Sequence, residues 1–79
     1  MRIIGTIPHP GFKISAFKNE NKFIIKVEAG PFEQSYKFLE SDEIHSFESL
    51  VKQWTKLQDT ELIRVFDQMN SNYKIINEH

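Results

Sequence analysis

The chain has 79 residues, no cysteine and a formal net charge of −1, with 10 Lys and Arg against 11 Asp and Glu. This length favours one small domain, and the missing thiols exclude a disulfide framework or a thiolate metal site. The balanced charge argues against a non-specific nucleic-acid or membrane-surface protein, because both usually carry a basic excess.

No apolar run approaches the roughly 20 residues that span a bilayer. The apolar start of the chain also meets Pro8 too early for a signal peptide. We therefore expect a cytoplasmic protein that does not enter a membrane. A domain of this size without cross-links often gains stability by oligomerising, so a homo-oligomer is one of the expected states.

The first expected strand covers residues 1–7, where apolar residues alternate around a central Gly5. A glycine inside a strand predicts either a β-bulge or another group that lies very close to the backbone. The sequence leaves the place of this strand in the sheet open, because it could pair with the second strand or lie elsewhere.

The segment Pro8-His9-Pro10-Gly11 ends this strand, since proline fixes φ and removes a backbone donor. We expect the loop to hold His9 in a restrained and exposed position. His9 is a candidate general acid, general base or metal ligand, or it simply fills the loop. We favour the structural interpretation, because no partner and no metal-ligand spacing is visible.

Residues 12–39 contain three runs in which apolar and polar residues alternate, as they do in half-buried strands. One face of the expected meander is almost continuously apolar, and it collects Phe12, Ile14, Ala16, Phe23, Ile25, Val27, Phe32, Gln34, Tyr36 and Phe38. The opposite face is mostly charged, although it also carries Phe17, Ile24 and Leu39. The apolar face should form the core.

The first turn of the meander is predicted to be a two-residue loop at residues 20–21, because Asn tolerates the positive φ of a tight hairpin. This register sets Phe17 opposite Ile24 and Lys13 opposite Glu28. Each face keeps its character, and opposite charges meet across the strands.

The second turn is predicted to be a four-residue loop at 28–31, which brings Lys26 opposite Glu33. A tighter turn at 30–31 would instead set Glu28 opposite Glu33. We prefer the longer loop, because like charges directly opposite each other are destabilising.

The sequence period changes after Leu39, and Ser46 is the expected N-cap of a first helix. Four apolar residues then follow the spacing of one helix face: Phe47, Leu50, Val51 and Trp54. Residues 55–58 should break this helix. The acidic stretch at 40–43 is assigned to the approach to the helix and not to a calcium site, because it has too few ligands and lacks glycine.

A second helix is predicted to begin at Asp59 or Thr60 and to end at Asn70-Ser71-Asn72. Its apolar stripe consists of Leu62, Val65, Phe66 and Met69. The remaining tail, residues 72–79, is expected either to fray or to dock through Tyr73 and Ile76.

The order of these elements predicts an α+β fold in one domain, residues 1–79. A four-stranded antiparallel sheet (residues 1–39, ββββαα order) should carry two C-terminal helices (45–71) on one face. No nucleophile, phosphate loop or metal motif is visible, so we predict no catalytic residue, no cofactor and no metal.

Two functional interpretations remain. The preferred one is a non-enzymatic protein-interaction module, binding another protein or a second copy, with candidate contact residues His9, Phe17, Ile24, Leu39 and Trp54. The alternative is a weak single-stranded nucleic-acid binder that uses Lys13, Lys26, Lys37 and Phe17 on the outer sheet face. Two glutamates on that face partly neutralise the lysines, which makes nucleic acid the less favoured partner.

The segments RIIGTIPHPGFKISAF and FEQSYKF resemble a family of short uncharacterised bacterial proteins that begin with a strand, a Pro-His-Pro turn and a second strand. The resemblance covers the N-terminal half well and the helices only loosely. It implies a small bacterial cytoplasmic protein, and it brings no activity, cofactor or functional residue with it.

Overall fold

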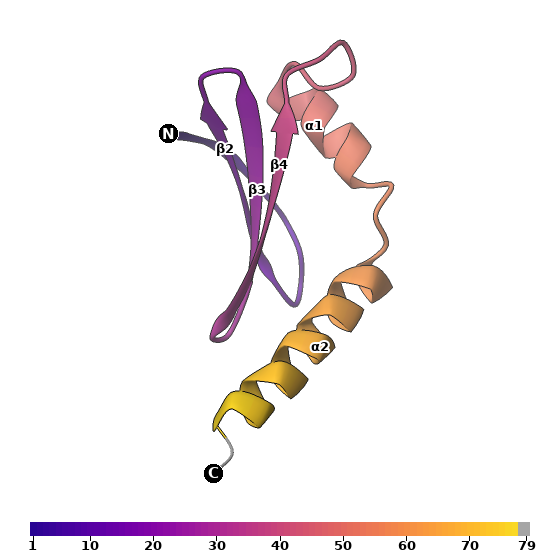
Figure 1. Cartoon of the computed structure of the whole chain (residues 1–79). Helices are drawn as coiled ribbons and strands as arrows, with labels where there is room; N and C mark the ends of the chain where they lie inside the picture. The colour runs from indigo at the N-terminus through magenta and orange to yellow at the C-terminus, as the bar shows by residue number, and fades with distance from the viewer. Residues whose placement is uncertain (78–79) are drawn as a thin grey trace.

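The structure is a computed structural model, and it describes residues 1–77. The chain forms an antiparallel sheet with strand order β1-β2-β3-β4, and Figure 1 shows the two helices that follow it. The elements are β1 (Arg2–Ile7), β2 (Lys13–Asn19), β3 (Lys22–Ala29), β4 (Phe32–Leu39), α1 (Phe47–Trp54) and α2 (Asp59–Asn77). The predicted α+β class and ββββαα order are therefore confirmed, and β1 takes its place beside β2.

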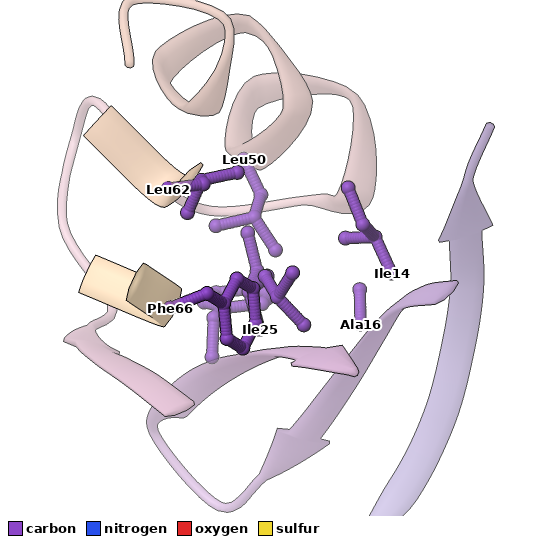
Figure 2. Close-up of a cluster of buried hydrophobic side chains, with 8 residues drawn as sticks. Ile14, Ala16, Ile25, Leu50, Leu62 and Phe66 are labelled. Carbon is purple, nitrogen blue, oxygen red and sulfur yellow. The ribbon is translucent and has the colours of Figure 1, made fainter. Parts of the chain in front are cut away.

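The core lies between the inner face of the sheet and the two helices. Figure 2 shows Leu50, Leu62 and Phe66 of the helices above Ile14, Ala16 and Ile25 of the sheet. Phe12, Tyr36 and Phe38 pack around this cluster, as the alternating pattern predicted. Both helices thus cover the same face of the sheet, and the outer face has neither helix on it.

The first hairpin has the predicted register. Phe17 pairs with Ile24 and Lys13 pairs with Glu28 across a two-residue turn. The positive φ of this turn falls on Glu20, at 57°, and not on an asparagine. The prediction of the turn is correct, but the residue expected to adopt the unusual backbone conformation is wrong.

The second hairpin differs from the prediction. It turns at Gly30-Pro31, with φ of 60° at Gly30, so Glu28 lies opposite Glu33 and Lys26 lies opposite Ser35. The tighter turn brings Phe23 opposite Phe38 on the inner face of the sheet. Repulsion between two carboxylates near the surface is weak. In contrast, Gly30 supplies the positive φ that a two-residue hairpin turn needs, and the tighter turn extends the ladder to the pair Ala29–Phe32.

Gly5 fulfils both expectations for a glycine in a strand. The pairing of β1 with β2 shifts between Ile3 and Gly5, which marks a bulge. A Cβ atom on Gly5 would lie only 2.6 Å from Cζ of Phe47, the first residue of α1. The absence of a side chain at Gly5 therefore allows α1 to sit directly on β1.

Helix α1 begins and ends as predicted. The Ser46 hydroxyl accepts a hydrogen bond from the Ser49 amide at 3.2 Å, and the Ser49 hydroxyl accepts one from the Ser46 amide at 2.9 Å. This reciprocal pair is a capping box in which serine stands where Glu or Gln is usual.

Helix α2 is longer than predicted, because it continues through Asn70-Ser71-Asn72 to Asn77. Poor helix formers cost only a few tenths of a kcal/mol each. The rings of Tyr73 and Phe32 make an edge-to-face contact, with 5.7 Å between their centroids. This contact holds the later turns of α2 against β4. Ile76 is 79% exposed and does not dock. Residues 78–79 of the predicted tail lie outside the described residues.

The predicted stripe of α2 also packs less completely than expected. Leu62 and Phe66 are buried and Met69 is half-buried, but Val65 is 42% exposed. The radius of gyration is 14.1 Å, against about 12 Å for a compact domain of this length. The far end of α2 projects past the β3–β4 hairpin (Figure 1), which explains this elongation.

A buried polar contact fixes α2 to β4. The Gln34 side-chain amide donates a hydrogen bond to the Leu62 carbonyl at 3.1 Å, and the Tyr36 hydroxyl donates to Oε1 of Gln34. Gln34 lies on the inner face and is only 6% exposed. Its buried amide is therefore hydrogen-bonded, as buried polar groups usually are.

The first prediction concerns Gly5. Gly5→Ala should lower the free energy of unfolding by about 1–3 kcal/mol, because the new methyl group overpacks against Phe47. Urea unfolding followed by Trp54 fluorescence, at one dilute protein concentration, measures this loss. The matched control is Gly11→Ala, whose Cβ would meet nothing closer than 3.5 Å. Equal stability of the two variants would contradict the close packing of α1 on β1.

The second prediction concerns the first turn. Glu20→Gly should raise the free energy of unfolding by about 0.5–1 kcal/mol, since an L-residue at positive φ carries a backbone cost that glycine lacks. Asn21→Gly is the control, and it should lower stability because Asn21 has no positive φ to relieve. The same urea titration measures both, and a loss of stability in Glu20→Gly would refute the assigned turn.

Candidate functional site

His9 is held inside its loop by backbone hydrogen bonds. Its Nδ1 accepts from the Gly11 amide at 2.9 Å and from the Phe12 amide at 3.1 Å. The imidazole also stacks on the ring of Phe12, with 4.7 Å between the ring centroids. Because Nδ1 accepts twice, the neutral ring must carry its proton on Nε2.

The other ring nitrogen faces the start of α2. Nε2 of His9 lies 3.0 Å from Oδ2 of Asp59, and the His9 side chain is only 14% exposed. The expectation that His9 is exposed is therefore wrong, because Phe12 and α2 enclose it. The distance suits a hydrogen bond, but the N–H direction does not, so Nε2 is buried without an aligned partner among the described residues.

A carboxylate beside the imidazole is the arrangement that an acid–base function of His9 would require. A cavity of about 350 Å³ adjoins it and is lined partly by Ile7, Trp54 and Leu57. However, Nδ1 is engaged by two amides and Nε2 is buried. Both nitrogens are thus directed at the protein itself, and the geometry favours a role for His9 in joining its loop to α2.

The predicted contact residues of the outer face do share one surface. Lys13, Lys26 and Lys37 lie on it, with Lys13 opposite Glu28. Nζ of Lys26 lies 5.3 Å above the centre of the Phe17 ring. Since a cation covers that ring, the ring is not an open platform for stacking a nucleobase.

The apolar residues of the outer face differ widely in exposure. Ile24 is only 6% exposed, although no helix covers it, while Leu39 is 66% exposed. Ile24 therefore offers little surface to a partner. Ile3, which sequence reasoning did not single out, lies opposite Phe17 and is also exposed.

An apolar groove lies between β4 and α1, and we call it the β4 groove. Its volume is about 390 Å³, and its main lining residues are Tyr36, Phe38, Ile44, Leu50, Trp54 and Leu57. Trp54 is half-buried, and its ring makes an edge-to-face contact with the ring of Tyr36, with 5.4 Å between the ring centroids. Trp54 thus anchors α1 and also forms part of a surface.

Sequence reasoning identified Trp54 but missed the groove as a whole. Ile44 and Leu57 come from the segments before and after α1, where no periodic pattern exists to reveal them. The only available signal was an isolated apolar residue within each polar connection. A single apolar residue in a connection does not predict a groove, because the other lining residues are brought beside it only by folding.

The β4 groove adjoins an open strand edge, because β4 is the last strand of the sheet. The pair that flanks a two-residue turn, here Ala29 and Phe32, is hydrogen-bonded. The ladder then alternates, so Glu33, Ser35 and Lys37 direct their backbone N–H and C=O groups away from β3. We call these outward groups the β4 edge.

Comparisons with protein-family models, curated proteins and solved structures found no match to this chain. The resemblance to short bacterial proteins therefore stays a prediction. Of the helices within residues 1–77, none combines the length and the hydrophobicity of a membrane span. In the same part of the chain, His, Asp and Glu side chains do not gather in threes as a metal site would need.

The third prediction tests the role of His9. His9→Ala should lower the free energy of unfolding by about 1–3 kcal/mol, because two backbone donors lose their acceptor. His9→Asn is the matched control, since an asparagine oxygen can accept from amides just ahead of it in the chain. Chemical unfolding should show that the free energy of unfolding falls from wild type to His9→Asn and falls further in His9→Ala. If alanine is as stable as wild type, the joining role is wrong.

Proposed function

We propose that this chain is a non-enzymatic protein-interaction module that binds an extended protein segment along the β4 edge. The segment adds a strand to the sheet, and its alternate side chains enter the β4 groove. This mode of recognition uses backbone hydrogen bonds for affinity and side-chain pockets for specificity.

The observation that carries this proposal is the position of the groove beside an open edge. Tyr36 and Phe38 line the groove and belong to β4 itself, while Leu50 and Trp54 form the facing wall on α1. A strand added to β4 would direct every second side chain to this inner face. Apolar side chains at those positions would then leave water and contact aromatic rings.

The composition of the groove fits such a ligand. The lining is mainly aromatic and aliphatic, with Gln53 and Lys56 as the polar members. A volume of about 390 Å³ falls in the lower part of the range of roughly 300–1,000 Å³ typical of ligand sites. Aromatic residues in a half-open groove are also the residues that contribute most energy to protein interfaces.

The outer face supports a second function less well. Nucleic-acid binding through Lys13, Lys26, Lys37 and Phe17 would need an exposed ring, and Lys26 lies over the only aromatic ring of that set. Glu28 and Glu33 also stand beside one another on that face. We therefore place the interaction on the inner side of the β4 edge.

The fourth prediction uses Ser35, whose N–H points away from the sheet. Ser35→Pro should weaken peptide binding about tenfold or more, because proline removes a central donor and blocks an added strand. The probe is a displayed library of random twelve-residue peptides, selected on the full chain. Selection should enrich peptides with alternating apolar residues, and these should bind Ser35→Thr as well as wild type.

Two results would refute the proposed function. One is a selection that enriches no alternating apolar peptide. The other is a set of enriched peptides that bind Ser35→Pro and wild type equally. A thermal unfolding curve of Ser35→Pro close to that of wild type shows that the variant retains its fold, since the lost N–H does not pair with β3.

A further inference from the structure

We infer that the segment that pairs with the β4 edge is β4 of a second copy, in an antiparallel register with Ser35 opposite Ser35. This inference rests on the proposed function of the edge and names its partner. The two four-stranded sheets would join into one sheet of eight strands around a two-fold axis through the serine pair.

Charge complementarity selects this register. With Ser35 opposite Ser35, Glu33 of each copy lies opposite Lys37 of the other, so two ion pairs form by symmetry. A register centred on Glu33 would oppose two carboxylates, and one centred on Lys37 would oppose two ammonium groups. The registers centred on Gln34 or Tyr36 leave these charges without opposite partners.

The hydrogen-bonding geometry agrees with the charges. Glu33, Ser35 and Lys37 are among the residues whose backbone groups point away from β3, and this register sets these three opposite one another. Each of the three opposed pairs can therefore exchange two N–H···O=C bonds. The edge strand thus finds partners for its unpaired groups, which an exposed edge otherwise offers to any passing strand.

The inner faces are also complementary. The same register places Phe32 of one copy opposite Phe38 of the other, and Gln34 opposite Tyr36. The two-fold axis runs perpendicular to the sheet, so both apolar faces lie on the same side. Phe38 lines the β4 groove, and the phenylalanine of the second copy would therefore lie at its margin.

The projecting end of α2 supplies an occupant for the groove. Tyr73 packs on Phe32, so this part of α2 in the second copy would follow its Phe32 toward the groove. At about 100° per residue, Val65 and Ile76 lie on one flank of α2, about 90° around the helix from Phe66. Val65 is 42% exposed and Ile76 79% exposed in one chain, so this flank is available for contact with the second copy.

The experiment exchanges the two charges. Wild type should be a dimer by size-exclusion chromatography with light scattering at high micromolar concentration. Glu33→Lys and Lys37→Glu should each raise the dimer Kd about tenfold or more, because each creates two like-charged pairs. An equimolar mixture of the two variants should recover a dimer, since every opposed pair is then attractive.

Two controls separate the interface from the fold. Lys22→Glu makes the same charge change as Lys37→Glu, but on β3 and away from the β4 edge. It should leave the dimer intact. The double variant Glu33→Lys/Lys37→Glu should dimerise with itself like wild type. Glu33→Lys also removes the repulsion with Glu28, so its loss of dimer cannot come from a weaker hairpin.

A monomeric wild type overturns the inference, and so does a dimer that both single variants retain. If such a monomer still binds alternating apolar peptides at the β4 edge, only the identity of the partner is wrong. If the mixture recovers a dimer while the peptide selection yields nothing, self-pairing stands and the edge does not accept foreign segments. The two proposals can therefore fail separately.

Discussion

The structure depends on covering one apolar sheet face with two helices of unequal length. Helix α1 has 8 residues and α2 has 19, and they contact the sheet at opposite ends. Gly5 lets α1 sit on β1, while Tyr73 holds α2 near the β3–β4 hairpin. The cover leaves the β4 groove open and the far end of α2 exposed. An incomplete cover and an adjoining unpaired edge are the physical basis of the association proposed above.

The position of α2 decides the shape of the open region, and two polar contacts fix it. His9 joins the β1–β2 loop to Asp59 at the first turn of the helix, and Gln34 binds the Leu62 carbonyl. Neither contact belongs to the apolar core. The hydrogen bond of Gln34 has one defined geometry, which apolar packing alone lacks, whereas His9 and Asp59 lie 3.0 Å apart without an aligned N–H. The feature that looked most like a catalytic residue in the sequence therefore has a structural explanation in its backbone hydrogen bonds.

The fold was predictable where the signal is local or periodic. Alternation placed Phe23, Ile25 and Tyr36 on the inner face, and the cap at Ser46 located α1. The failures share a physical cause, since each depends on a contact between distant residues. The full β3–β4 ladder, from Lys22–Leu39 to Ala29–Phe32, outweighs the repulsion of Glu28 and Glu33. Packing of Tyr73 on Phe32 carries α2 past its expected end, and the groove needs Ile44 and Leu57 brought together by folding.

The central claim is that the outward N–H and C=O groups of β4 lack a protein partner in the monomer and are hydrogen-bonded in the dimer. Amide hydrogen exchange of Ser35, compared with Gln34 at low and high protein concentration, tests this most directly. Gln34 directs its N–H to β3 and should exchange slowly at both concentrations. The Ser35 amide should exchange fast in dilute protein and slowly in concentrated protein. Exchange at Ser35 that does not change with concentration would contradict the account.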